Sequence, residues 1–269
     1  MPYVFEHLDL FRKAIRRSPF GLITDVDGTI SLTAPTPQEA KISPLCRQYL
    51  SALCKQLALV AAISGRPAIE VRDMMKIDGM VYIGNHGLEQ WVGGQSEFPR
   101  EAKNYFEVVK DAVEELTPLL SIEGISIQDK GVTATIHYRL CREPQSAEKH
   151  ILSVLENSSH ARRLQIIREK MAIDLLPPLG VNKGTATLDL IHRYNLQGGI
   201  YLGDDLTDIY AFRAIHAASR DSDFQGFAIG ITSQEMPPEL ETEVDFILNG
   251  VNDVEYFLKW MSQIALEVS

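Results

Sequence analysis

The sequence predicts a doubly wound α/β core with a smaller α+β unit inserted into it. Short apolar runs without alternation end abruptly at polar or glycine-rich residues, as strands buried on both faces of a parallel sheet do. Amphipathic segments with helical spacing separate these runs. The chain has 269 residues, more than one compact domain usually holds, so we expect a large core and a second, smaller domain.

Six apolar runs are expected to form the core strands. They lie at 20–24, 57–63, 80–83, 199–202, 226–231 and 244–248. Helical patterns lie between them, at 43–56, 68–75, 183–194 and 208–217. A further amphipathic helix is expected within residues 1–20, because apolar residues recur there at helical spacing. Strands that alternate with helices predict a parallel sheet covered on both faces.

The middle of the chain has a different pattern. Helices are expected at 100–116 and 145–155, and alternating strands at 122–130, 132–140, 164–168 and 171–176. Lys130-Gly131 and Glu169-Lys170 separate the members of each strand pair, which predicts two hairpins. The stretches 93–99 and 177–180 are rich in proline and glycine and mark the seams. We therefore assign residues 1–97 and 179–269 to the core and 98–178 to the inserted α+β domain.

The composition limits the partners and the compartment. A formal net charge of −10 argues against nucleic acid or an anionic membrane as the main partner. Cys46, Cys54 and Cys141 are odd in number and have no paired spacing, so we expect reduced thiols and no zinc site. No signal peptide or membrane span is visible, and a cytoplasmic protein is expected.

Two carboxylates follow the first core strand, in Asp25-Val26-Asp27-Gly28-Thr29. Ligands of open α/β sheets bind beyond the carboxyl ends of the strands, and Gly28 permits the bend that would turn both acids into that crevice. One carboxylate can attack phosphorus and form an aspartyl-phosphate, while the other protonates the leaving oxygen and then activates water. The alternative interpretation is a strand-to-loop turn with two surface acids.

Three more carboxylates follow the strand at 199–202, in the segment Gly203-Asp204-Asp205-Leu206-Thr207-Asp208. Such a cluster is repulsive unless a cation neutralises it, and hard oxygen ligands with room for phosphate suit Mg²⁺. The alternative is that Thr207 or Asp208 simply caps the next helix, although a cap would not require Asp204 and Asp205.

A hydroxyl and a lysine complete the set of candidate phosphate ligands. Ser64, in Ser64-Gly65-Arg66, ends the strand at 57–63 and can donate a hydrogen bond to a phosphoryl oxygen. Lys183 begins a helix, against the helix macrodipole, which makes sense if its charge neutralises a phosphate. Alone, each has a simpler interpretation: a common Ser-Gly turn and a solvated lysine.

Taken in order, these four segments resemble the four motifs of haloacid dehalogenase (HAD) superfamily phosphatases. The resemblance implies a HAD-like core with a cap domain, Asp25 as the nucleophile and Asp27 as the general acid/base. It also implies that Ser64 and Lys183 hold the phosphoryl oxygens and that Mg²⁺ is the cofactor. The implied magnesium ligands are Asp25, the Asp27 backbone carbonyl and Asp204, supported by Asp205 or Asp208.

Longer segments resemble trehalose-6-phosphate phosphatases, from Gly21 to about Leu248. They are Ser64-Gly65-Arg66-Pro67, Gly84-Asn85-His86-Gly87-Leu88-Glu89, Lys130 with His137-Tyr138-Arg139, and the acidic segment 203–208. The resemblance implies that the inserted domain is a cap that selects the leaving group. The implied sugar-binding residues are Gly65, Arg66, Asn85, His86, Glu89, Lys130, His137 and Arg139. Such donors and acceptors suit a polyhydroxyl ligand, although His137 and Arg139 also fit outer positions of a solvent-facing strand.

The chain departs from that family shortly before Lys183. The family has Glu-x-Arg/Lys-Pro there, and its glutamate contacts sugar hydroxyls, whereas this chain has Asp174-Leu175-Leu176-Pro177-Pro178. Asp174 could replace the glutamate after a shift of one residue, but strand alternation is expected to turn it to the other face. A second departure, Asp208-Ile209-Tyr210-Ala211-Phe212, removes acids near the metal.

Three functions are compatible with these patterns. The first is hydrolysis of trehalose 6-phosphate to trehalose and phosphate, with a separate trehalose-phosphate synthase as a possible partner. The second keeps this chemistry but acts on another sugar or glycosyl phosphate. The third is a catalytically silent regulatory module, which the retention of all the motif acids disfavours.

Overall fold

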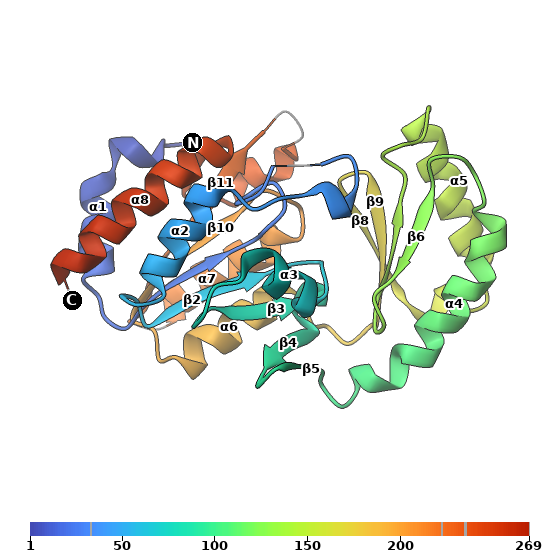
Figure 1. The fold of residues 1–269 in the computed structure, drawn as a ribbon, viewed down its shortest axis with the longest axis horizontal. Helices are drawn as coiled ribbons and strands as arrows, with labels where there is room; N and C mark the ends of the chain where they lie inside the picture. The colour runs from blue at the N-terminus through green and yellow to red at the C-terminus, as the bar shows by residue number, and fades with distance from the viewer. Residues whose placement is uncertain (33, 222, 234–235, 269) are drawn as a thin grey trace. The chain divides into compact units, whose positions relative to one another are not determined.

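The structure, a computed structural model, describes residues 1–32, 34–221, 223–233 and 236–268 (Figure 1). The chain divides into two compact units. The first comprises Met1–Ala34, Ala40–Ser96 and Val181–Ser269, and the second comprises Pro35–Glu39 and Glu97–Gly180. None of the helices in the described ranges is both long and apolar enough to cross a membrane.

Within the described residues, eight strands form the sheet of the first unit. In spatial order they are β12 (Phe246–Asn249), β11 (Gln225–Thr232), β10 (Gly198–Gly203), β1 (Phe20–Thr24), β2 (Leu59–Ile63), β3 (Val81–Gly84), β4 (Glu89–Val92) and β5 (Gln95–Glu97). Neighbours from β12 to β3 are parallel, and β4 is antiparallel to β3. The strand order reverses around β1, which pairs with β10 and β2, so the carboxyl end of β1 is a topological switch point.

Helices cover both faces of this sheet. One face packs against α1 (Leu8–Ile15), α2 (Pro44–Leu53), α3 (Ala68–Met75) and α8 (Gly250–Val268), and the other against α6 (Lys183–Arg193) and α7 (Asp208–Asp221). Adjacent residues of β1 divide between the two faces: Leu22 joins the first cluster and Ile23 the second. Every residue of β1, β2 and β10 is buried, which explains why these strands read as continuous apolar runs.

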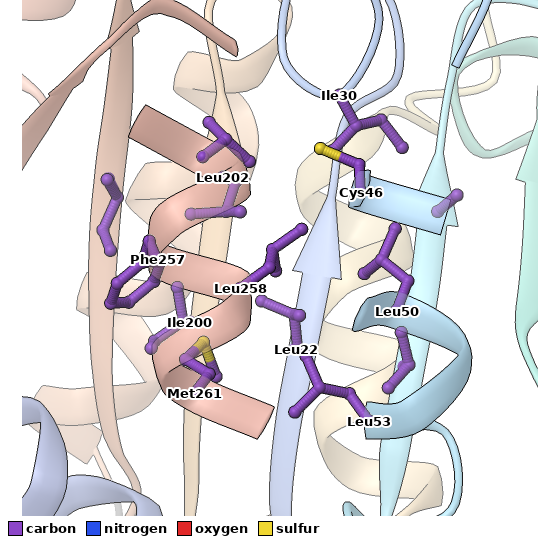
Figure 2. Close-up of a cluster of buried hydrophobic side chains, with 14 of the residues drawn as sticks. Leu22, Ile30, Cys46, Leu50, Leu53, Ile200, Leu202, Phe257, Leu258 and Met261 are labelled. Carbon is purple, nitrogen blue, oxygen red and sulfur yellow. The ribbon is translucent and has the colours of Figure 1, made fainter. Parts of the chain in front are cut away.

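The larger apolar cluster fixes the middle of the sheet. Figure 2 shows Leu22 of β1 between Leu53 of α2 and Met261 of α8, with Ile200 and Leu202 on the neighbouring strand β10. Their side chains are fully buried or nearly so, and each buried side chain of this size contributes about 1.5–3 kcal/mol by leaving water. This packing holds the carboxyl ends of β1 and β10 next to one another.

The second unit has a four-stranded antiparallel sheet in the order β6 (Ser126–Asp129), β7 (Ala134–His137), β9 (Ala172–Leu176) and β8 (Gln165–Glu169). Its helices, α4 (Phe106–Leu119) and α5 (Pro144–Asn157), pack on one face. Alternate residues such as Ile173 and Leu175 enter that apolar cluster. Short 3-10 helices occur at Val4–Glu6, Pro37–Glu39, Asn85–Gly87, Ala102–Tyr105, Ala161–Arg163 and Pro238–Thr242.

The predicted α/β fold with an inserted α+β unit is confirmed, and so are most element positions. The expected strand at 20–24 and helix at 68–75 coincide with β1 and α3. The first helix begins later than the apolar spacing suggested, because Val4–Glu6 form a separate 3-10 turn. The predicted strand at 122–130 was too long: Gly124, with a φ of +88°, turns the chain before β6 begins.

Two elements had no sequence-based prediction. The hairpin of β4 and β5 extends the core sheet at its edge, where we had expected only the start of a seam. Its strands are short and only partly buried, so their alternation is weak. The C-terminal helix α8 supplies Phe257, Leu258 and Met261 to the larger apolar cluster.

Candidate active site

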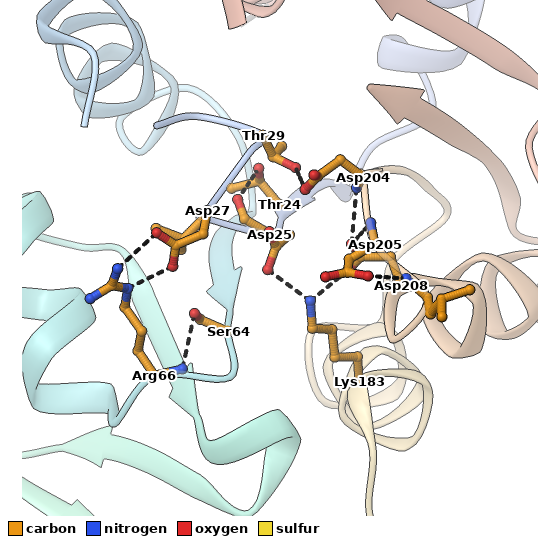
Figure 3. A network of polar contacts seen from close by, with 12 residues as sticks. Thr24, Asp25, Asp27, Thr29, Ser64, Arg66, Lys183, Asp204, Asp205 and Asp208 are labelled. Atoms are coloured by element: carbon orange, nitrogen blue, oxygen red, sulfur yellow. Dashed lines mark hydrogen bonds and ion pairs between the residues drawn. The ribbon is translucent and has the colours of Figure 1, made fainter. Parts of the chain in front are cut away.

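The ends of three neighbouring strands bring the candidate residues together (Figure 3). Asp25 follows β1, Ser64 follows β2 and Asp204 follows β10. Lys183 is the first residue of α6, and its Nζ lies 2.7 Å from Asp25 Oδ1 and 2.7 Å from Asp208 Oδ1. The structure thus joins segments that are far apart in the sequence in one buried ion-pair network.

The start of α6 explains how Lys183 reaches this network. The side chain of Asn182 accepts hydrogen bonds from the backbone N–H groups of Gly184 and Thr185, at 2.9 and 3.1 Å. Thr185 Oγ1 accepts in turn from the Asn182 N–H, which completes a capping box. The helix therefore begins at a fixed residue, and the Lys183 side chain, 3% exposed, is directed at the two carboxylates.

Asp208 accepts four hydrogen bonds within the site. Its Oδ1 accepts from Lys183 Nζ and from the Tyr201 hydroxyl, each at 2.7 Å. Its Oδ2 accepts from the backbone N–H groups of Asp204 and Asp205, each at 3.0 Å. Burial, and next the charge of Asp208, raise the pKa of Tyr201 well above its ordinary value. Asp208 thus shapes the loop that carries Asp204, from the first position of α7.

Asp204 is held against the loop that follows β1. Thr29 Oγ1 donates a 3.0 Å hydrogen bond to Asp204 Oδ1. Gly28 has a φ of +87°, and a side chain at this position would overlap the Asp204 carboxylate. Only glycine adopts that backbone angle without cost and also leaves room for the acid. The glycine of the first motif is therefore required for the contact between the two acidic segments.

Three buried acids lie close together in this site, and Lys183 pairs with two of them. One carboxylate oxygen from each of Asp25, Asp204 and Asp208 lies within 4.8 Å of the other two, and all three residues are buried. Burial raises the pKa of Asp25 well above its ordinary value, the ammonium of Lys183 lowers it, and the charges of Asp208 and Asp204 raise it further. Buried carboxylates this close together are a donor set that fits a divalent cation with hard oxygen ligands.

Asp27 and Arg66 form a separate pair beside this network. Arg66 donates from Nε to Asp27 Oδ2 at 2.6 Å and from Nη2 to Asp27 Oδ1 at 2.8 Å. Bidentate pairing of this kind fixes the orientation of a carboxylate. The Asp27 side chain keeps 40% exposure, whereas the Arg66 side chain keeps only 11%. Asp27 is thus the more solvent-accessible member of this pair.

Several residues predicted to bind sugar lie around the Ser64 loop. Ser64 Oγ accepts from the Arg66 N–H at 3.2 Å, and Gly65 packs against the His86 ring. Asn85, His86 and Glu89 are all buried. Asp205 lies in the turn before α7, where its Oδ1 accepts from the Leu206 N–H at 2.6 Å.

Three residues predicted to bind sugar lie in the inserted unit: His137 ends β7, Arg139 lies just after it, and Lys130 lies between β6 and β7. His137 Nε2 lies 3.3 Å from Gln128 Oε1, and Arg139 donates to the Lys170 carbonyl at 3.3 Å. Lys130 Nζ lies 3.9 Å from Asp174 Oδ1.

The expectation that strand alternation turns Asp174 away from the other polar groups was wrong. Asp174 pairs with Thr135 across β7 and β9 and accepts a hydrogen bond from its hydroxyl. Its neighbours Ile173 and Leu175 enter the apolar cluster under the helices. Asp174 therefore lies on the opposite face of the sheet from Ile173 and Leu175, beside Thr135 and near Lys130, because β9 pairs with β7 in the register that sets Asp174 opposite Thr135.

Sequence reasoning missed the hydroxyl groups that support the acids. Tyr201 lies inside an apolar run, where nothing distinguishes it from a core residue. Thr29 was part of the first motif, and its position four residues after Asp25 was the signal that could have identified it.

Comparisons with known proteins agree with this arrangement. The family model for trehalose-phosphatase matches residues 23–248. The chain is 26% identical over 258 residues to the probable trehalose-phosphate phosphatase D of Arabidopsis thaliana, covering 88% of this chain and 66% of that protein. It is 26% identical over 222 residues to the trehalose-phosphate phosphatase of Mycobacterium tuberculosis, covering 80% of this chain and 56% of that protein. The chain therefore spans less than two thirds of the length of either relative.

Solved structures share the fold. The C-terminal domain of the trehalose-6-phosphate phosphatase of C. albicans has a TM-score of 0.82 with this chain. The comparison covers 97% of this chain and 98% of that one, at 18% sequence identity. This likeness supports a common fold.

Substitution of Gly28 tests the contact between the two acidic segments. Gly28→Ala should lower the free energy of unfolding by about 1–2 kcal/mol for the left-handed backbone and by about 1–3 kcal/mol more for the overlap with Asp204. Gly94→Ala is the matched control, because Gly94 has a φ of +91° and no atom within 4 Å of an added Cβ. Urea unfolding measures the loss of unfolding free energy in both variants. Equal losses would mean that Asp204 does not depend on Gly28.

Proposed function

The chain belongs to the trehalose-phosphatase family, and on this premise we propose that it hydrolyses trehalose 6-phosphate to trehalose and phosphate. The observation that carries the proposal is the Asp25–Lys183–Asp208 network at the switch point of the sheet, next to Asp204. A phosphate monoester is an anion, and a basic group in the first positions of a helix beside a strand-end carboxylate suits its chemistry.

In the proposed mechanism, Asp25 is the nucleophile. A carboxylate oxygen of Asp25 attacks phosphorus, the bond to the sugar oxygen breaks, and an aspartyl-phosphate forms. Asp27 gives a proton to the departing sugar oxygen, and then takes a proton from the water that attacks the aspartyl-phosphate. The second step releases inorganic phosphate and restores both carboxyl groups.

Arg66, Ser64 and Lys183 assist without forming bonds to phosphorus. The bidentate contact from Arg66 orients the Asp27 carboxylate. Ser64 and Lys183 are proposed to bind the phosphoryl oxygens. Lys183 also lowers the repulsion between an anionic substrate and the Asp25 carboxylate, whose burial would otherwise favour the protonated, non-nucleophilic form.

Mg²⁺ is the proposed cofactor. Asp25 and Asp204 are the proposed side-chain ligands, with the Asp27 backbone carbonyl and with support from Asp205. Asp208 already accepts four hydrogen bonds, so its proposed role is to hold the ligand loop. When bound, the ion supplies positive charge that stabilises the phosphoryl group in the transition state.

The inserted unit supplies the groups proposed to bind the sugar. Lys130, His137 and Arg139 can offer hydrogen-bond donors, and Asp174 can offer an acceptor in the same unit. The second candidate function is hydrolysis of another sugar phosphate, favoured by one observation: Leu175 lies in the apolar cluster of this unit, in the stretch where the family has polar sugar contacts. A separate synthase partner and a cytoplasmic location stay predictions.

A screen of sugar phosphates distinguishes the two candidates. With Mg²⁺ present, we expect phosphate release from trehalose 6-phosphate to exceed release from glucose 6-phosphate and other hexose phosphates by at least about 100-fold in kcat/KM, because a site built to bind hydroxyl groups loses several kcal/mol when they are absent. A clear preference for another sugar phosphate would select the second candidate. No release from any of them would exclude both.

Removal of the metal tests the proposed cofactor. We expect EDTA to abolish turnover and excess Mg²⁺ to restore it. Mg²⁺ alone should also raise the melting temperature of the wild type, since an ion that binds only the folded chain stabilises it. Asp204→Asn should lose that rise, whereas substitution of an exposed acid, Asp73→Asn, should keep it. Turnover that survives chelation would contradict the assignment.

A further inference from the structure

The turn at Asn85–Gly87 has an unusual backbone. Asn85, His86 and Gly87 have φ angles of +49°, +59° and +111°. Three consecutive residues in this region are uncommon, and a left-handed conformation costs a residue other than glycine about 1–2 kcal/mol. Such strain persists only where surrounding contacts impose it.

One set of these contacts joins the turn to the Ser64 loop. The Asn85 N–H donates to the Arg66 carbonyl at 2.9 Å, and the His86 N–H donates to the Ser64 carbonyl at 3.0 Å. A Cβ added to Gly65 would lie 2.7 Å from the His86 ring. The turn and the loop are therefore in close backbone contact, and a shift of one moves the other.

A second set joins the same turn to the start of α6. A Cβ added to Gly87 would lie 2.8 Å from the Asn182 carbonyl oxygen and 3.3 Å from the Ala186 side chain. Asn182 caps α6 and directly precedes Lys183. The turn thus lies between the two groups proposed to bind the phosphoryl oxygens, Ser64 and Lys183, and contacts the backbone that carries each.

The Glu89 carboxylate accepts hydrogen bonds that hold the turn in place. Its Oε2 accepts from the Ala68 N–H at 2.9 Å and from Asn85 Nδ2 at 2.7 Å. Its Oε1 accepts from the Ser96 hydroxyl. Glu89 is 3% exposed, and both of its oxygens are bonded to donors of its own unit. This carboxylate ties the turn to the first residue of α3 and to β5.

We infer that Glu89 is a positioning residue, not a sugar ligand: it holds the Asn85–Gly87 turn, which sets the spacing between Ser64 and Lys183. The inference rests on the proposed function and reassigns a residue that the sequence placed among the sugar contacts. A change at Glu89 then disturbs the binding of the phosphoryl group, which every substrate has, and not the binding of the sugar.

Two substrates distinguish a positioning role of Glu89 from a role in binding the sugar. Glu89→Gln replaces an oxygen that accepts hydrogen bonds with an NH₂ group that faces donors, so the turn should shift. We expect kcat/KM to fall about 10- to 100-fold, by the same factor for trehalose 6-phosphate and for p-nitrophenyl phosphate, which has no sugar hydroxyls. The matched control is Glu97→Gln, the same change at an exposed glutamate of β5, which should leave both values unchanged.

A loss confined to the sugar phosphate would overturn the inference, because it would mean that Glu89 contacts the sugar. Unchanged kinetics on both substrates would overturn it as well. If Glu89→Gln does not fold, Asn85→Ala removes one donor from the same network and should give a smaller loss, again equal for both substrates.

Hydrogen–deuterium exchange provides a readout that does not depend on turnover. Glu89→Gln should increase exchange in two separate segments, the Ser64 loop and the start of α6. If exchange rises in neither segment, the positioning role of Glu89 is contradicted, even if the kinetics change. A wild type without phosphatase activity would instead contradict the proposed function, and the exchange data would still decide the role of Glu89.

Discussion

One buried ammonium group controls the geometry of this site. Lys183 Nζ lies 2.7 Å from a carboxylate oxygen of Asp25 and of Asp208, and so ties the end of β1 to the starts of α6 and α7. Removing one partner of a buried charge pair usually costs about 3–5 kcal/mol, because the other charge is left uncompensated. The network therefore specifies how three separate segments meet, and it holds Asp25 and Asp208 close to Asp204, in the cluster of carboxylates proposed to bind Mg²⁺.

The parts of this arrangement that depend on local pattern were predictable from the sequence. The strand before Asp25 is a run of residues buried on both faces, and its bounds were predicted without error. Parallel strands also bring their carboxyl ends to the same edge of a sheet, so Asp25, Ser64 and Asp204 were expected to lie near one another. Lys183 was identified because its position at a helix start runs against the macrodipole.

The remaining features depend on tertiary contacts that periodicity does not encode. Tyr201 lies in an apolar run, and only the fold places its hydroxyl against Asp208. Glu89 ends the family-like segment at 84–89, but its burial beside a turn with a left-handed backbone is not predicted by any pattern. Asp174 lies beside Thr135 because of the register in which β9 pairs with β7, and such long-range pairing is not encoded by local periodicity.

The central claim is that Asp25 becomes covalently phosphorylated, and trapping that species tests it most directly. The Asp27→Asn variant, incubated with p-nitrophenyl phosphate and Mg²⁺, should accumulate the intermediate, since this leaving group needs no proton while attack by water needs the missing base. Acid quenching and peptide mass spectrometry should then find one phosphate on the peptide that contains Asp25, and none when Asp25 is also changed to Asn. A burst of p-nitrophenol without a phosphorylated peptide, or with phosphate on another residue, would contradict the account.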